Sequence, residues 1–171
     1  MWALVHQQLY NAGEAMLTGD KELAYKVISR ERRVNAFELK IDSDCEDIIA
    51  LYAPVAIDLR FVLAMYKINT NLERLGDFAE SIARFAGNLP EGEPIDPQLV
   101  KETRVEEMLS ELLSMISLTK EAFEKESSEI ASRIFLKDNL IDEINHNSTA
   151  IIAKYCLLYT SPSPRDRSLS R

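Results

Sequence analysis

Residues 54–86, PVAIDLRFVLAMYKINTNLERLGDFAESIARFA, carry the pattern that decides the fold. Apolar residues recur in this stretch at the spacing of one helix face. The pattern predicts one long helix, with the other helices of the chain packed against it. The recurring apolar positions are Phe61, Leu63, Met65, Ile68, Leu72, Leu75, Ala79, Ile82 and Phe85.

A polar row runs through the same stretch. Asn69, Glu73 and Asp77 follow one another at intervals of four residues, which places their side chains on one face of the helix. Two like charges at this spacing destabilise a helix by a few tenths of a kcal/mol, and Gly76 within a helix costs about 1 kcal/mol relative to alanine. We therefore expect the carboxylates to share a cation and the glycine to admit a neighbouring helix.

The segment D-L-R, followed by L-E-R-L-G-D-F-A-E-S-I-A, closely resembles the signature helix of the PhoU family, whose pattern is ERxGD. Residues 73–77 form one full copy, and the preceding P-V-A-x-D-L-R fits as well. The resemblance extends over residues 1–155. It implies two three-helix bundles made by duplication, with E/D-x-x-x-D motifs that bind metal in some members.

Proline placement and composition predict an all-α fold. All six prolines lie at position 54 or in 90–97 and 162–164, and helix interiors exclude proline. The last helix of the first bundle then leads into a linker rich in proline, glycine and acid. The predicted helices are 1–18, 21–52, 55–89, 98–126 and 127–155, and the predicted domains are a first bundle at 1–89, a linker at 90–97 and a partial second bundle at 98–155.

An internal repeat supports the duplication. A shift of 107 positions aligns 14–35 with 121–142 and places Glu31 and Asn35 on Asp138 and Asp142. The same shift would put the second copy of Glu73 and Asp77 beyond residue 171. We therefore expect the second bundle to lack its last helix, which would expose apolar faces and favour aggregation or domain swapping.

The C-terminal stretch 156–171, CLLYTSPSPRDRSLSR, has no amphipathic period. It resembles the translation of an adapter used in transposon-based sequencing libraries. We expect these residues to be a non-native, disordered tail on a gene fragment.

Acidic side chains on the second and third predicted helices indicate a metal site. Carboxylate and amide oxygens suit hard cations such as Mg²⁺, Mn²⁺, Ca²⁺ or iron, and helical bundles build such sites from facing helices. The alternative is a solvated acidic face balanced by Arg32, Arg33 and Arg74. The candidate metal ligands are Glu31, Asn35, Glu73 and Asp77, with Asp138 and Asp142 as a half site.

Composition limits the function. The net charge of −8 argues against nucleic acid as the main partner. No apolar run is long enough to span a membrane, and the opening residues do not resemble a signal peptide, so we expect a cytoplasmic protein. We find no nucleophile–base arrangement and no phosphate-binding glycine loop.

By resemblance, the chain is a non-enzymatic regulator that restrains phosphate uptake and binds the phosphate ABC transporter and a sensor histidine kinase. A homodimer is also expected. One alternative is a ferritin-like enzyme with a carboxylate-bridged metal centre, but such enzymes use two Glu-x-x-His motifs, and this chain has only Glu143–His146. The other alternative is a helical scaffold without metal.

Overall fold

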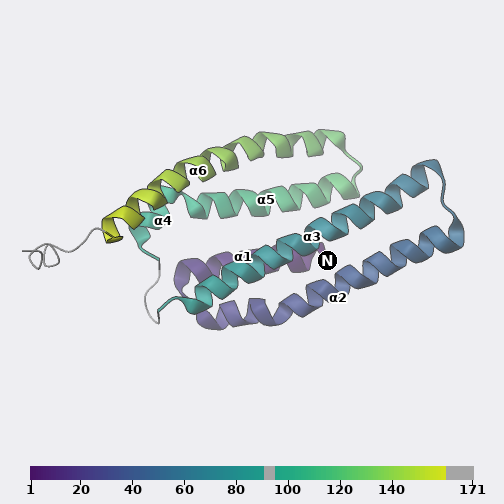
Figure 1. The fold of residues 1–171 in the computed structure, drawn as a ribbon. Helices are drawn as coiled ribbons and strands as arrows, with labels where there is room; N and C mark the ends of the chain where they lie inside the picture. Colours follow the sequence, from purple (N-terminus) through teal and green to yellow (C-terminus); the bar gives the residue numbers. More distant parts are fainter. Residues whose placement is uncertain (91–94, 161–171) are drawn as a thin grey trace, which may run out of the picture. The chain divides into compact units, whose positions relative to one another are not determined.

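The computed structural model describes residues 1–90 and 95–160, with side chains as far as 157. These residues form helices and no strand, which confirms the all-α prediction (Figure 1). The first three helices lie where the sequence predicts them. The helices are α1 (Trp2–Thr18), α2 (Lys21–Tyr52), α3 (Ala56–Asn88), α4 (Pro97–Thr103), α5 (Val105–Glu124) and α6 (Ser128–Thr160).

Two compact units make up the chain, Met1–Ile95 and Asp96–Arg171. The division falls within 90–97. In the first unit, α3 packs against both α1 and α2. Gly19, in the left-handed conformation, ends α1, and the Asp20 side chain then caps α2 by accepting a hydrogen bond of 2.9 Å from the Leu23 amide. None of the helices in the described residues is long and apolar enough to cross a membrane.

Small side chains dominate the core of the first unit. The buried face of α3 includes Gly76, Ala79, Ala83 and Ala86, at the three- and four-residue intervals of one helix face. Small residues allow helix backbones to approach closely. The buried hydrophobic residues of this unit are Val5, Leu9, Ala12, Ala15, Ala24, Val27, Val34, Cys45, Val62, Leu72, Ala79, Ala83 and Ala86.

The predicted apolar face of α3 is therefore partly wrong. Phe61, Leu63 and Phe85 are each more than half exposed. On α2, Val27 and Val34 are buried, whereas Leu51 near the end of the helix is exposed. The prediction from hydrophobicity selected the large apolar residues of α3 as its buried face. The helix instead contacts its neighbours through the face that carries its smallest residues.

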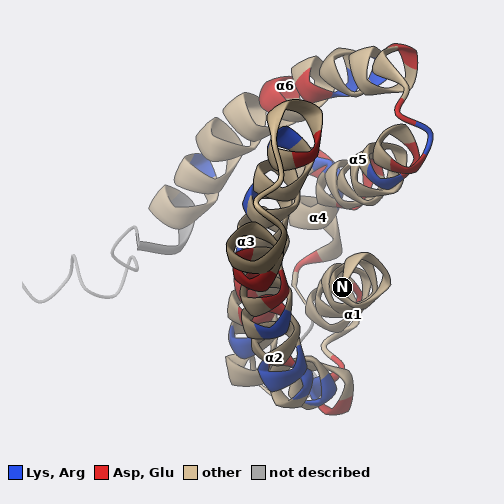
Figure 2. Cartoon of the chain, turned by 90° about the vertical axis from the view of Figure 1, so that its right-hand side faces the viewer, with Lys and Arg blue, Asp and Glu red and all other residues tan. Residues whose placement is uncertain are grey.

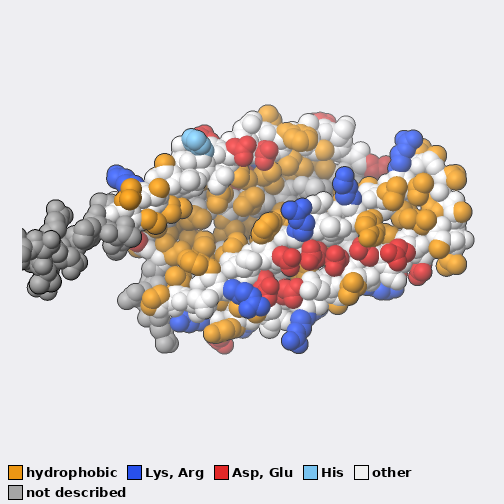
Figure 3. All heavy atoms as spheres, in the orientation of Figure 1, with side chains coloured by type: hydrophobic (Ala, Val, Ile, Leu, Met, Phe, Trp, Pro, Cys, Tyr) orange, Lys and Arg blue, Asp and Glu red, His pale blue; other side chains and the backbone are white. Residues whose placement is uncertain are grey.

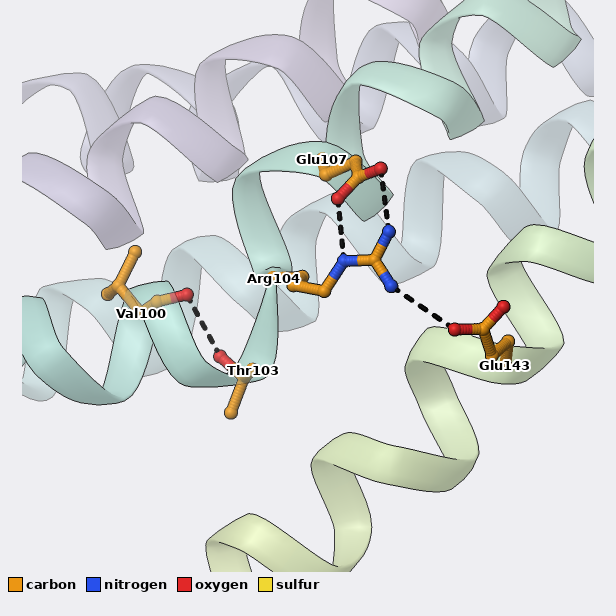
Figure 4. A network of polar contacts seen from close by, with 5 residues as sticks. All are labelled: Val100, Thr103, Arg104, Glu107 and Glu143. Carbon is orange, nitrogen blue, oxygen red and sulfur yellow. Dashed lines mark hydrogen bonds and ion pairs between the residues drawn. The ribbon is translucent and has the colours of Figure 1, made fainter.

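The second unit corrects the prediction of one helix over 98–126. The backbone leaves the helix at Arg104, where φ is 53°, and separates α4 from α5. The Arg104 guanidinium donates hydrogen bonds of 2.7 and 2.8 Å to the two carboxylate oxygens of Glu107 and one of 3.3 Å to Glu143 of α6 (Figure 4). The break allows both α4 and α5 to pack against α6.

The predicted end of the last helix at Tyr155 is also wrong. Helix α6 continues to Thr160; the rest of the predicted tail lies outside the described residues. Leucine and tyrosine can extend a helix, and the first strong stop signal in the sequence is Pro162. Shifted by 107 positions, α2 spans 128–159, so the repeat places α2 on α6.

Candidate functional site

The candidate site lies on the α2–α3 pair, and Gly76 lets these helices approach each other. A Cβ atom placed on Gly76 would lie 2.9 Å from Cγ1 of Val34 on α2. Real side chains do not tolerate that distance, so only glycine fits without displacement. This confirms the expectation that the glycine admits a neighbouring helix. Figure 3 shows a row of acidic side chains along this pair of helices.

Asn69 begins the polar row and is only 2% exposed. Its side-chain amide donates a hydrogen bond of 2.7 Å to the carboxylate of Asp42 and one of 2.9 Å to the backbone carbonyl of Glu38. These bonds tie α3 to α2 and fix their register. The predicted site omits all three residues, although their spacing was a usable signal: Asn69 is four residues from Glu73, and Glu38 and Asp42 are three and seven residues from Asn35.

Glu73 lies in the middle of the row and is half-buried. Burial raises the pKa of the Glu73 carboxyl, and the negative charges of Asp77, Glu38 and Glu31 raise it further. The structure therefore brings three of the predicted ligands, Glu31, Glu73 and Asp77, into electrostatic contact across α2 and α3. Such a group concentrates negative charge that a cation would offset.

Asn35 supplies an uncharged oxygen next to this group. Its Oδ1 atom is buried and has no hydrogen-bond partner among the described residues. An unpaired buried oxygen costs free energy. A hard cation bound by this oxygen would remove that cost, so the oxygen atoms of the row fit such a cation. Within 1–90 and 95–157, however, no three His, Cys, Asp or Glu side chains come together closely enough to hold a metal ion.

The other two predicted ligands lie on the second unit. Asp138 and Asp142 are both exposed on α6. The single Glu-x-x-His motif is also on α6, and its Glu143 pairs with Arg104. The described part of the second unit therefore assembles no metal centre of the ferritin-like kind.

An open cavity of about 420 Å³ adjoins the row at its Glu31 end. Two arginines and two glutamates share its wall, and Arg84 pairs with Glu80 at 2.6 Å. The balanced charges give the cavity no preference for an anion or a cation. Its lining residues are Ile28, Ser29, Glu31, Arg32, Glu80 and Arg84.

Comparisons with known proteins place the chain among relatives of similar sequence and fold. The PhoU domain family model matches residues 1–86. A protein from Aquifex aeolicus named phosphate-specific transport system accessory protein PhoU homolog is 35% identical over 92% of this chain and 69% of its own length. The Escherichia coli protein named phosphate-specific transport system accessory protein PhoU is 35% identical over 84% of this chain, and the chain spans only 58% of it.

The solved structures point the same way. The crystal structure of PhoU from Pseudomonas aeruginosa superposes with a TM-score of 0.84 at 28% identity, covering 98% of this chain and 77% of that one. These matches give no support to the ferritin-like enzyme. The signature helix, the duplicated helices and the matched relatives together show that the chain belongs to the PhoU family.

Proposed function

We propose that this chain is a regulator of phosphate uptake and of the response to phosphate starvation. The observation that carries the proposal is the match of the first unit to the PhoU domain, together with relatives named as accessory proteins of the phosphate-specific transport system. The chain would restrain import by binding the phosphate ABC transporter, and it would pass the state of the transporter to a sensor histidine kinase. It would act in the cytoplasm, without catalysis.

The test is complementation. The chain is expressed in a bacterium that lacks its own PhoU protein, and the uptake of labelled phosphate and a phosphate-starvation reporter are measured. We expect both to fall towards the level of the parent strain. Unchanged uptake and reporter activity, with the chain present and folded in the cell, would contradict the proposal.

A metal bound between α2 and α3 is the second part of the proposal, with a structural or regulatory role. Three observations favour it: the raised pKa of Glu73, the neighbouring Asp77 and Glu31, and the unpaired oxygen of Asn35. A Mg²⁺, Mn²⁺ or iron ion would supply the positive charge that this row lacks. Small movements of the side chains would be needed to bring three donors onto one ion.

Isothermal titration with Mn²⁺ tests the metal directly. We expect binding by the wild-type chain, and its loss in the Glu73→Gln/Asp77→Asn variant. The matched control is Asp138→Asn/Asp142→Asn, which removes two charges from exposed positions on the other unit. Equal binding by both variants would show that the metal does not lie between α2 and α3.

A further inference from the structure

The end of the α2–α3 hairpin presents a large apolar surface. Leu51, Tyr52, Val55 and Ile57 are each between 73% and 78% exposed, and Ile48 and Ile49 lie beside them at just under 40%. We call these six residues the hairpin tip. Figure 3 shows hydrophobic side chains gathered at this end of the hairpin. Contiguous exposed apolar surface of this kind marks an interaction site.

The backbone holds the hairpin tip in one shape. Ala53 ends α2 in the left-handed conformation, with φ 45°, and its amide donates a hydrogen bond of 3.2 Å to the carbonyl of Ile49. The ring of Pro54 fixes its own φ, and the Asp58 amide then donates a hydrogen bond to the carbonyl of Val55. A surface that is already ordered loses little conformational entropy when it binds.

Carboxylates flank the hairpin tip along the chain and outnumber the flanking basic residues, Lys40 and Arg60. Asp44, Glu46 and Asp47 precede it on α2, and Asp58 follows it in the first turn of α3. Lys40 pairs with Asp44 at 2.6 Å. Within the described residues, Glu46, Asp47 and Asp58 take part in no ion pair. Figure 2 shows this end of the hairpin from the front, with most of its ribbon in the colour of uncharged residues.

The carboxylates that flank the hairpin tip form its acidic edge. Their charge indicates which kind of partner could bind there. A second copy docked through the same surface would bring its carboxylates against these, and the negative surface of a membrane would repel them. A protein with lysine and arginine around an apolar groove is complementary in both respects. We propose that the hairpin tip docks into an apolar groove with a basic rim on a partner protein. This inference does not depend on the role in phosphate uptake.

The experiment uses the full chain and two model peptides. One amphipathic helical peptide carries leucine on one face and lysine at its edges, and the other carries glutamate in place of lysine. Binding is measured by fluorescence anisotropy at low and high salt. We expect the lysine peptide to bind at least tenfold more tightly than the glutamate peptide, and the Leu51→Ser/Ile57→Ser variant to lose at least tenfold in affinity.

Tyr25→Ser/Phe78→Ser is the matched control, because these side chains are also more than half exposed but lie away from the hairpin tip. It should bind the lysine peptide as the wild type does, and circular dichroism should show every variant to be folded. A second variant, Glu46→Lys/Asp47→Lys, should lose affinity for the lysine peptide through charge alone.

Three outcomes overturn the proposal. The first is equal binding of the lysine peptide by the wild type and the Leu51→Ser/Ile57→Ser variant, including no binding by either. The second is sedimentation of the wild type, but not of this variant, with phosphatidylglycerol vesicles, which would assign the surface to lipid. The third is a lower molar mass of this variant by light scattering, which would assign it to a second copy.

Discussion

Gly76 is a single residue whose missing side chain determines how closely two helices pack. Because a Cβ atom here would meet Val34 at 2.9 Å, we expect Gly76→Ala to separate α2 from α3 locally and to lower the free energy of unfolding by about 1–3 kcal/mol. Urea unfolding followed by circular dichroism measures the change.

The matched control is Gly87→Ala on the same helix. Nothing lies within 4 Å of a Cβ atom at Gly87, so alanine should gain helix propensity there and stabilise the chain by up to about 1 kcal/mol. If both substitutions stabilise the chain, the helices do not require glycine for their contact, and the close packing of α2 and α3 is not the reason for Gly76.

The Glu73 carboxyl makes the stability of the folded chain depend on pH. Its pKa is raised, by burial first and then by neighbouring carboxylates, so the folded chain holds this proton more tightly than the unfolded chain does. The contribution of Glu73 to stability is therefore greatest below the ordinary pKa of glutamate, and it falls as the pH rises to the raised pKa of the folded chain.

Glu73→Gln should remove this fall. At pH 7 and with a chelator present, we expect the variant to be more stable than the wild type by a few tenths of a kcal/mol, the size of a like-charge pair at this spacing. Thermal unfolding between pH 4 and 8 measures it, with Glu14→Gln on α1 as the control for one lost charge. A variant that is less stable at pH 7 would mean that Glu73 has a favourable partner in the folded chain.

At the scale of elements, the break between α4 and α5 depends on Arg104. A residue other than glycine in the left-handed region costs about 1–2 kcal/mol, and here the guanidinium offsets that strain by joining Glu107 on α5 to Glu143 on α6 (Figure 4). Backbone conformation and ion pairs can be separated by substitution, because glycine and alanine both remove the charge but only alanine keeps the strain.

We expect Arg104→Ala to be less stable than Arg104→Gly by about 1 kcal/mol. Both variants lose the same ion pairs, so the difference reports the left-handed backbone alone, and urea midpoints of the two variants measure it. The opposite order, with alanine more stable, would be expected if 98–126 formed one continuous helix, as the sequence pattern alone predicts.

Helix positions were largely predictable because their boundaries depend on local chemistry. Gly19 and Asp20 are stop and cap signals that act within a few residues, and the end of α1 and the start of α2 follow from them. The break at Arg104 was not predictable, since it is stabilised by Glu143, which lies 39 residues away. Burial on α3 was misjudged for a similar reason: which face is covered depends on α1 and α2, not on the hydrophobicity of α3.

The candidate site was likewise predictable only in part. Spacing within one helix could be seen in the sequence, whereas contacts between helices could not. The four-residue spacing of Asn69, Glu73 and Asp77 placed these residues on one face, but only the structure shows that Asn69 bonds to Asp42. Whether the row binds metal depends on side-chain movements that no sequence pattern specifies, so that part stays a prediction.

At the scale of the whole molecule, the two units differ in how much core they possess. The first unit buries thirteen hydrophobic residues, whereas the described part of the second unit buries only Ala122 and Ile144. Burial of apolar side chains is the main source of stability, at about 1.5–3 kcal/mol for each large one. Phe135 and Leu136 of the second unit are instead about three-quarters exposed.

The units should therefore open with different free energies. In hydrogen exchange of the full chain, we expect the amides of α5 and α6 to exchange at least tenfold faster than those of α2 and α3, because local opening needs less free energy where fewer apolar contacts are lost. The amides in the middle of α3, around the buried Leu72, serve as the internal reference for slow exchange. Equal protection of α3 and α6 would show that the second unit has a source of stability besides its own core, such as association with another surface that covers Phe135 and Leu136.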